Sequence, residues 1–297
     1  MSYIDFKSIL NKKPIIIKFL ALLSIARWYN VLLILLSLYF VQIFIFDTSK
    51  RFLLTLQSLN IHLYVFSILV IIMGGYLINA FYDFEKDMIN QPNKTYFGVL
   101  VSKKTCLNVY ILLNICGLIS SILIGKEILI FNLFLILSLW LYSHKLRKKA
   151  LLSEISASLL MISFFIGLSV LNWRIDFTLV LFITYIFTID LTREIVKKMT
   201  SIKGDLVVGE KSIPILIGIK KSKYIIFFLM LSSQLAILFL LPKVINQLFS
   251  YYFILAFVII LYCIFLLYNA KTSKQYEFIN NVYKGLIGLA IFSIILF

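Results

Sequence analysis

Charged residues are scarce in this chain of 297 residues. Asp, Glu, Lys and Arg make up only 14% of it, 62% of the residues are hydrophobic, and the mean hydropathy is +1.01. Because a soluble domain has about a quarter of its residues charged, this composition excludes a soluble globular domain and a disordered chain. The apolar stretches are continuous and do not alternate with polar residues, which favours a polytopic helical membrane protein over a membrane barrel.

Cysteine and histidine are also rare. The three cysteines lie in apolar stretches without the spacing of a metal site, and the chain has only two histidines. These absences exclude a disulfide-stapled secreted module and argue against zinc, so we interpret the cysteines as small core residues. The net charge of +16 does not indicate a nucleic-acid partner. The basic residues stand between apolar runs, where Lys and Arg set topology and meet anionic membrane lipids.

Nine apolar runs are candidates for helices that cross the membrane, which takes about 20 residues each. They are Trp28–Phe46, Phe52–Tyr82, Thr105–Gly125, Ile128–Ser143, Ile155–Trp173, Phe177–Ile189, Tyr224–Leu241, Val244–Ala270 and Gly285–Phe297. The fourth, sixth and ninth runs are short, and we expect the sixth to continue into Asp190–Lys197. The sequence therefore predicts an all-α bundle of nine transmembrane helices. We expect one transmembrane domain over residues 1–297, with a short cytoplasmic N-terminal segment at residues 1–17.

The basic residues are distributed unequally between the two ends of this predicted bundle. The N-terminus and the loops on its side contain 24 Lys and Arg, whereas the loops on the other side contain 5. The positive-inside rule then places the N-terminus and the longer loops in the cytoplasm, in the cell (inner) membrane. Residues 1–13 lack a signal-peptidase pattern, so we expect no cleaved leader. A functional site is expected to open to the cytoplasmic face.

Acidic residues gather in two short windows on that face. Seven of the 13 carboxylates lie there: Asp83, Glu85 and Asp87 in the first, and Asp190, Glu194, Asp205 and Glu210 in the second. Carboxylates near a membrane are costly and are rare without a partner or a function. A secondary transporter would carry its charges near the bilayer midplane. Their position at one face therefore favours an enzyme.

The first window has a helical spacing. Asn79, Asp83 and Asp87 are separated by four residues each, so on a helix they form one stripe. Hard oxygen ligands in such a stripe suit Mg²⁺, which takes one or two carboxylates and completes its shell with water and substrate phosphates. No His or Cys is nearby to favour zinc. The alternative is a solvated helix end, but Asn79 lies inside the apolar run and needs an interior partner there.

This stripe, followed by Ile89-Asn90-x-Pro92-x-Lys94, resembles the first signature of the UbiA family of intramembrane prenyltransferases. Three further segments resemble motifs of that family in the same order. They are Arg27-Trp-Tyr-Asn30, in which Trp28 replaces a proline, Tyr142-Ser-His-Lys-Leu146-Arg147, and Arg193-Glu194-Ile-Val-Lys197 with Gly204-Asp205 and Gly209-Glu-Lys-Ser-Ile-Pro214. The resemblance covers most of the chain.

The resemblance implies Mg²⁺-dependent transfer of an isoprenyl group from an allylic prenyl diphosphate. Asp83, Asp87 and Asp205 would be catalytic metal ligands, with Asn79 as a further ligand. The substrate-binding residues would be Asn30, Lys94, Tyr142, Arg147, Lys197 and Lys198. The bundle would hold the lipid tail in a dry cavity that protects an allylic cation from water.

The second signature departs from the family pattern. Lys198 and Ser201 stand where aspartates are expected, and only Asp205 remains. One interpretation is that Lys198 supplies positive charge directly to the diphosphate, since lysine is a compact point charge suited to phosphate. The other is that the site has decayed and binds a prenyl lipid without catalysis. We favour the first, because the first signature and the basic residues are intact.

The acceptor is indicated by Arg193-Glu194-Ile-Val-Lys197. This segment resembles the branch of the family that attaches geranylgeranyl groups to glycerol-phosphate ethers, and the basic residues around it suit a phosphate-bearing acceptor. An aromatic acceptor such as a quinone precursor is the alternative. Haem is disfavoured, because His62 and His144 are the only histidines and do not form a cluster.

Overall fold

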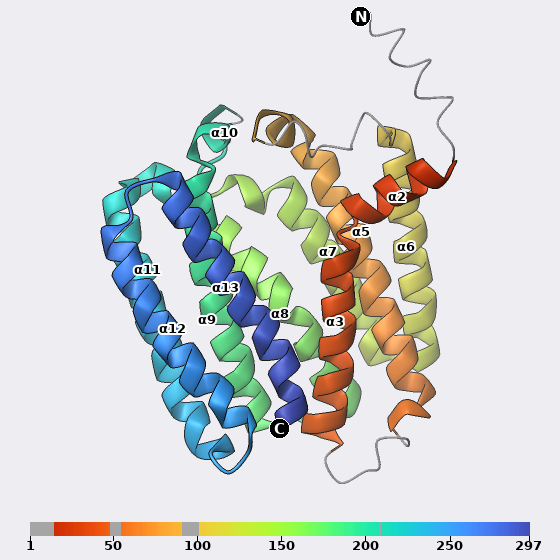
Figure 1. Ribbon diagram of the computed structural model, residues 1–297. Helices are drawn as coiled ribbons and strands as arrows, with labels where there is room; N and C mark the ends of the chain where they lie inside the picture. The colour runs from red at the N-terminus through yellow and green to blue at the C-terminus, as the bar shows by residue number, and fades with distance from the viewer. Residues whose placement is uncertain (1–14, 48–54, 91–100, 208) are drawn as a thin grey trace, which may run out of the picture.

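Long apolar helices run along one another through nearly the whole of the described chain (Figure 1). The computed structural model describes residues 15–47, 55–90, 101–207 and 209–297, without the side chains of residues 15, 85–90 and 203. The α-helices are α2 (Ile15–Ile25), α3 (Trp28–Phe40), α5 (Leu59–Asn90), α6 (Lys103–Ile124), α7 (Lys126–His144), α8 (Leu152–Asn172), α9 (Phe177–Thr200), α10 (Ile202–Val207), α11 (Ile213–Val244), α12 (Phe249–Asn269) and α13 (Ser273–Ser293). A π-helical turn, η1 (Val41–Phe46), continues α3, and 3₁₀ turns form η3 (Leu146–Lys148) and η4 (Ile294–Leu296).

Eight of these elements are long and apolar enough to cross a membrane. They are α3 with η1, α5, α6, α7 with η3, α8, α11, α12 and α13 with η4. α9 is as long as they are, but its second half has five charged residues, which are Asp190, Arg193, Glu194, Lys197 and Lys198. It packs against α8, α11 and α13 and is therefore part of the bundle. With α9 the described residues contain nine bundle helices, and the predicted all-α polytopic membrane fold is confirmed.

Several helices begin where polar side chains bind free backbone amides. The Ser102 hydroxyl accepts a hydrogen bond from the amide of Thr105 at the start of α6, at 3.1 Å. The Asp176 carboxylate does the same for Leu179 at the start of α9, at 3.1 Å. Thr272 and Gln275 form a reciprocal capping box at the start of α13. Such caps satisfy the amides that the first helical turn leaves without partners.

The predicted starts of two helices are more than ten residues too late. α13 begins at Ser273, well before the expected start at Gly285, because Lys274, Glu277 and Lys284 interrupt the apolar run without interrupting the helix. α11 begins at Ile213 instead of Tyr224, and its first turn is separated from the rest by Gly218, whose φ is 81°. The sixth run does continue past Ile189 as expected, because α9 ends at Thr200.

The first described helix was not expected. α2 is a short apolar helix that overlaps the predicted N-terminal segment, and residues 1–14 of that segment lie outside the described residues. Its Phe19 and Leu20 are exposed, whereas Ala21 packs against Leu77 of α5 in a small cluster. α2 lies at the same end of the bundle as α10, and the C-terminus lies at the other end (Figure 1). An odd number of crossings, as predicted, accounts for this.

The interior of the bundle is apolar and aromatic at mid-height and toward the C-terminal end. Phe182 and Tyr185 of α9 pack on Phe249 and Phe253 of α12. The hydroxyls of Tyr185 and Tyr252 lie 2.7 Å apart, and Tyr252 donates to the carbonyl of Leu286 at 3.0 Å. Buried hydroxyls with partners are compatible with an apolar core. Charged side chains of this bundle are concentrated at the end where α10 lies.

Candidate functional site

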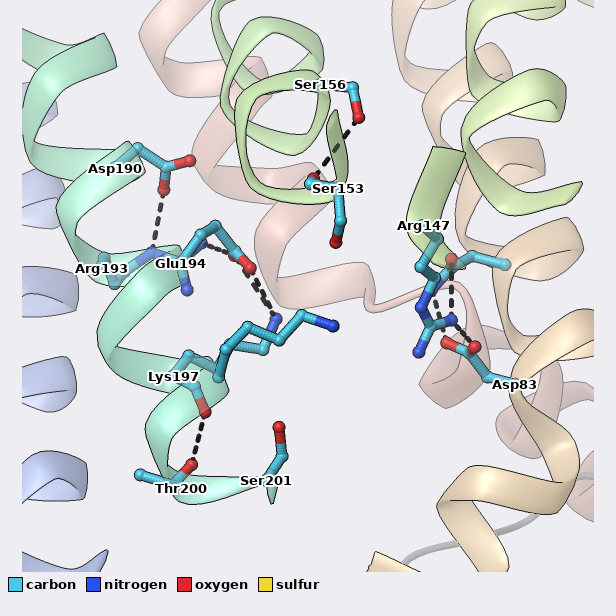
Figure 2. Close-up of polar contacts among 12 residues, drawn as sticks. Asp83, Arg147, Ser153, Ser156, Asp190, Arg193, Glu194, Lys197, Thr200 and Ser201 are labelled. Carbon is cyan, nitrogen blue, oxygen red and sulfur yellow. Dashed lines mark hydrogen bonds and ion pairs between the residues drawn. The ribbon is translucent and has the colours of Figure 1, made fainter. Parts of the chain in front are cut away.

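Acidic and basic side chains from α5, η3 and α9 lie near the end of the bundle that carries α10. Figure 2 shows the pair of Asp83 and Arg147 and, on the other side of the view, the charged side chains of α9. Asn79 and Asp83 lie one turn apart on α5, as their spacing predicts, and the Asn79 amide donates to Asp83 Oδ2 at 3.0 Å. Arg147 of η3 forms an ion pair with Asp83 and donates to Asn79 Oδ1 at 3.3 Å. Asp83 is 7% and Arg147 9% exposed. A buried charge is stable only with a partner, so each of these two stabilises the other.

Among the Lys and Arg residues in and next to η3, the local chain path buries Arg147 alone. α7 ends at His144, and the short turn η3 buries Arg147 while Lys145, Lys148 and Lys149 stay exposed. The amide of Lys211 donates to the carbonyl of Lys148 at 3.2 Å. This bond fixes the turn against the segment that precedes α11.

A second group of charges surrounds Lys198 at the end of α9. The Lys198 ammonium lies 3.6 Å from Asp205 Oδ2 and 3.3 Å from Glu210 Oε2. Ser201 donates to the same Asp205 carboxylate at 3.2 Å. Lys198 is 6% exposed and Asp205 is fully buried. The two positions that depart from the family pattern, Lys198 and Ser201, therefore both bind the one aspartate that remains.

Glu210 joins the two groups. Its Oε1 lies 3.6 Å from Arg147 Nε, while its Oε2 contacts Lys198. Negative and positive side chains thus alternate in the order Asp83, Arg147, Glu210, Lys198 and Asp205. Residues more than 120 positions apart in sequence meet in this row. We call these five residues the charged row.

The remaining acidic residues of the second window form a separate group on α9. Arg193 Nε donates to Asp190 Oδ1 at 2.9 Å, and Arg193 also pairs with Glu194. The Lys197 ammonium lies 3.2 Å from Glu194 Oε2, and the Lys197 side chain is 48% exposed. Lys197, a predicted substrate-binding residue, therefore contacts Glu194 and is more accessible than Lys198.

The other predicted site residues lie around these groups. Asn30 at the start of α3 donates to the Tyr76 hydroxyl of α5 at 3.4 Å, and the Arg27 guanidinium lies 5.3 Å from the centre of the same ring. Tyr142 is half-buried on α7. The side chain of Asp87, although its backbone continues α5, and all of Lys94 lie outside the described residues.

Four residues of this region were not among the predicted site residues: Arg193, Glu194, Glu210 and Ser153. The ion pairs of Arg193 with Asp190 and of Glu194 with Lys197 follow from their i, i+3 spacing on one helix, which the sequence shows. Glu210 was noted as acidic but no partner was foreseen. Ser153 at the start of α8 lies between the α9 side chains and Arg147 (Figure 2), and its hydroxyl is buried without a hydrogen-bond partner among the described residues. A buried hydroxyl of this kind suits contact with a polar ligand group.

The oxygen donors at this site suit Mg²⁺ with water and substrate phosphates in its shell better than they suit a metal ion whose ligands all come from the protein. Among the described side chains no three His, Cys, Asp or Glu residues are grouped to hold a metal ion. Asn79 and Asp83 offer an amide oxygen and a carboxylate on one face of α5, and the Arg147 cation lies against both. Such a partial set of hard oxygen donors is what Mg²⁺ uses when substrate phosphates and water complete its shell.

Comparisons with known proteins agree with this architecture. The sequence model of the UbiA prenyltransferase family matches residues 53–282. The digeranylgeranylglyceryl phosphate synthase of Sulfurisphaera tokodaii is 31% identical over 55% of this chain and 61% of its own length. The synthase of the same name from Thermococcus gammatolerans is 27% identical over 75% of this chain and 80% of its own length. The alignment with the first of these spans about three fifths of that relative.

Solved structures share the fold at low sequence identity. A structure of digeranylgeranylglyceryl phosphate synthase in membranes superposes with a TM-score of 0.73 at 21% identity, over 94% of this chain and 97% of that one. A UbiA homologue from Archaeoglobus fulgidus, bound to GPP and Mg²⁺, superposes with a TM-score of 0.64 at 17% identity, over 93% and 99%. At identities this low, the superpositions establish a common fold alone.

Proposed function

Because the chain belongs to the UbiA prenyltransferase family, we propose that it transfers an isoprenyl group from an allylic prenyl diphosphate to a glycerol-phosphate ether lipid. The observation that carries the proposal is the charged row, which buries two cations near one end of an apolar bundle. An amphiphile with a diphosphate head and a hydrocarbon tail matches both parts. Several relatives are named digeranylgeranylglyceryl phosphate synthase, which supports the choice of acceptor.

Arg147 and Lys198 are the proposed diphosphate-binding cations. A guanidinium presents a fork of N–H donors and an ammonium presents a point charge, and both bind phosphate oxygens well. Since the two side chains are almost completely buried, their attraction for an anion is weakly screened by water. Lys197 and Lys94 are proposed as outer contacts of the same diphosphate.

Asn79, Asp83 and Asp87 of α5, with Asp205 of α10, are the proposed Mg²⁺ ligands. Bound there, Mg²⁺ would neutralise the charge that develops on the departing diphosphate. The Archaeoglobus fulgidus structures that hold GPP or DMAPP together with Mg²⁺ support this cofactor. Asp205 shares its surroundings with Lys198, so we expect fewer metal ions here than at a site with all the usual aspartates.

In the reaction the bond between C1 of the prenyl chain and the diphosphate oxygen breaks, and the diphosphate leaves with the electron pair. Arg147 and Lys198 stabilise the leaving group by hydrogen bonds that strengthen as its charge grows. The acceptor oxygen then forms the new bond at C1 and loses its proton. The apolar interior excludes water from the allylic cation, and aromatic faces such as that of Tyr142 are proposed to stabilise it.

The acceptor is proposed to bind near the basic turn after α7. Lys145, Lys148, Lys149 and Lys211 are exposed around the buried Arg147, and Lys211 is joined to Lys148 by a backbone hydrogen bond. A concentration of positive charge of this kind raises the local concentration of an anionic lipid head group. It supports a phosphate-bearing acceptor over an uncharged aromatic one.

A binding protein without catalysis is the second candidate. It is favoured by Lys198 and Ser201, which replace expected carboxylates and are both engaged with Asp205. Such a protein would bind the prenyl diphosphate but release no diphosphate.

One assay separates these functions. Purified protein is incubated with labelled geranylgeranyl diphosphate, Mg²⁺ and, in turn, geranylgeranylglyceryl phosphate, 4-hydroxybenzoate or no acceptor. We expect diphosphate release and a labelled lipid product only with the glycerol-phosphate ether. Labelled 4-hydroxybenzoate would contradict the acceptor, and tight binding without release in every arm would favour the second candidate.

The orientation proposed for the chain has its own test. With the N-terminus and the charged row on the cytoplasmic side, a reporter fused after Phe297 should be active only outside the cytoplasm. A reporter fused before Met1 should behave in the opposite way. Both reporters on one side would contradict the proposed topology.

A further inference from the structure

The carboxylate of Glu210 lies between the two cations that we propose bind the diphosphate. One of its oxygens is 3.6 Å from Arg147 Nε and the other is 3.3 Å from Lys198 Nζ. The side chain is 5% exposed and comes from the segment between α10 and α11. A single anionic group thus contacts both cations at once, which is the contact a diphosphate would make.

Neither cation depends on Glu210 alone. Arg147 is also paired with Asp83, and Lys198 is 3.6 Å from Asp205. The contacts of Glu210 with these two cations, at 3.6 and 3.3 Å, are longer than the 2.7–2.9 Å typical of strong charge-assisted hydrogen bonds. Glu210 can therefore leave the charged row while Arg147 and Lys198 each keep a carboxylate partner.

We propose, on the basis of the function proposed above, that Glu210 is a specificity-determining residue that admits a metal-bound diphosphate and disfavours a metal-free one. A diphosphate that contacts both Arg147 and Lys198 must take the place of the Glu210 carboxylate. A metal-free diphosphate is repelled by the negative charge of Glu210, which adds to the charge of the nearby Asp83 and Asp205 carboxylates. The repulsion acts on the anion before any bond in the substrate changes.

A divalent cation reverses this effect. Bound to the diphosphate, it would lower the net negative charge of that ligand. It would also give the displaced Glu210 carboxylate a new cationic partner, since carboxylates are preferred ligands of Mg²⁺. Glu210 then changes from a competitor of the ligand to a partner of the metal that the ligand brings. The discrimination between the two forms of diphosphate is therefore expected to reside in the charge of this one side chain.

The test measures binding and needs no turnover. Inorganic diphosphate is titrated into the full-length protein by calorimetry, in chelator and in Mg²⁺, for the parent and for Glu210→Gln. Glutamine keeps the size and the acceptor oxygen but removes the charge. We expect Glu210→Gln to bind metal-free diphosphate about tenfold more tightly than the parent does, and the advantage given by Mg²⁺ to shrink by a similar factor.

Asp176→Asn is the matched control. It makes the same change in net charge at the opposite end of α9, and asparagine caps a helix as well as aspartate does. It should leave both affinities within twofold of the parent. If Asp176→Asn raised metal-free affinity as much as Glu210→Gln, the effect would come from net charge and the proposal would be overturned.

The proposal would also be overturned if Glu210→Gln and the parent bound metal-free diphosphate with equal affinity. Weaker binding by Glu210→Gln would overturn it as well, because Glu210 would then be a positioning residue. Glu210→Asp keeps the charge but is too short to reach both cations, so it should shift metal-free affinity in the same direction by less. It provides the test if the glutamine variant does not fold. If the parent binds diphosphate neither in chelator nor in Mg²⁺, the proposed function itself is contradicted. If the parent catalyses prenyl transfer but has the same diphosphate affinities as Glu210→Gln, only the role of Glu210 is contradicted.

Discussion

The two ends of this bundle both bury polar groups, but they do so with different chemistry. At the α10 end the charged row alternates carboxylates with cations. At the other end Gln42 of η1 and Asn172 of α8 exchange amide hydrogen bonds of 3.0 and 2.8 Å. The amide pair satisfies itself locally, at little electrostatic cost. Buried alternating charge is expensive to assemble and is better explained by a ligand that needs it.

The C-terminal end also contains a cavity. A space of about 170 Å³ lies beside Gln42, Asp47, Thr55 and Asn172. Its polar groups are tied to one another, since Thr55 and Gln42 donate to the Asp47 carboxylate at 2.9 and 3.0 Å. Although this end has a cavity, it has no pair of buried cations among its described residues. We therefore propose that an anionic ligand binds at the charged row and not in this cavity.

Loss of Asp83 should have the largest effect on function. Asp83→Asn keeps the shape of the side chain and its contact with Asn79 but removes the charge that pairs with Arg147 and that we propose binds Mg²⁺. We expect the rate of prenyl transfer to fall by about 10²–10³ or more, since removal of one electrostatic contact to a transition state costs that much. Membrane insertion should be unchanged, whereas thermal stability should also fall, because Arg147 loses the charged partner of a buried ion pair; the rate is therefore compared at a temperature at which both proteins are folded. Near-normal turnover would remove α5 from the site.

Loss of Lys198 should have a smaller effect, on binding. Lys198→Ala removes one charge-assisted contact, so the affinity for geranylgeranyl diphosphate should fall about tenfold. Titration of the prenyl diphosphate at several Mg²⁺ concentrations measures this. The double change Lys198→Asp with Ser201→Asp should raise the number of Mg²⁺ ions on which activity depends, because two more carboxylates repel the diphosphate unless another cation joins them. Equal affinity in parent and Lys198→Ala would mean that Lys198 pairs with Asp205 and Glu210 without binding the diphosphate.

At the C-terminal end a comparable change should affect stability alone. Asn172→Ala breaks the amide pair with Gln42 and leaves that amide with fewer partners. We expect a loss of about 1 kcal/mol in the free energy of unfolding, measured by denaturation in detergent, with the rate of transfer unchanged. The double variant with Gln42→Ala should be less stable than Asn172→Ala alone, because Gln42 also donates to the buried Asp47 carboxylate. A large loss of activity in either variant would contradict the functional division between the two ends.

The sequence predicted what depends on periodicity and composition. The run of apolar residues gave the bundle, and the four-residue spacing of Asn79 and Asp83 gave their shared face on α5. The start of α13 was missed because hydropathy reads Lys274 and Glu277 as loop residues, although the Thr272–Gln275 capping box was visible in the sequence. Glu210 was missed for a different reason. Its partners lie on other elements, and local spacing contains no information about contacts with Arg147, 63 positions earlier.

The charged row near the α10 end is proposed to bind the diphosphate, and each role proposed for Arg147, Lys198 and Glu210 depends on this. The most direct measurement is a structure of the protein with a non-hydrolysable thiolodiphosphate analogue of geranylgeranyl diphosphate and Mg²⁺. We predict diphosphate density between the side chains of Arg147 and Lys198, with the Glu210 carboxylate displaced from its present contacts and the prenyl tail inside the bundle. Diphosphate density elsewhere, with Glu210 still between the two cations, would contradict the account.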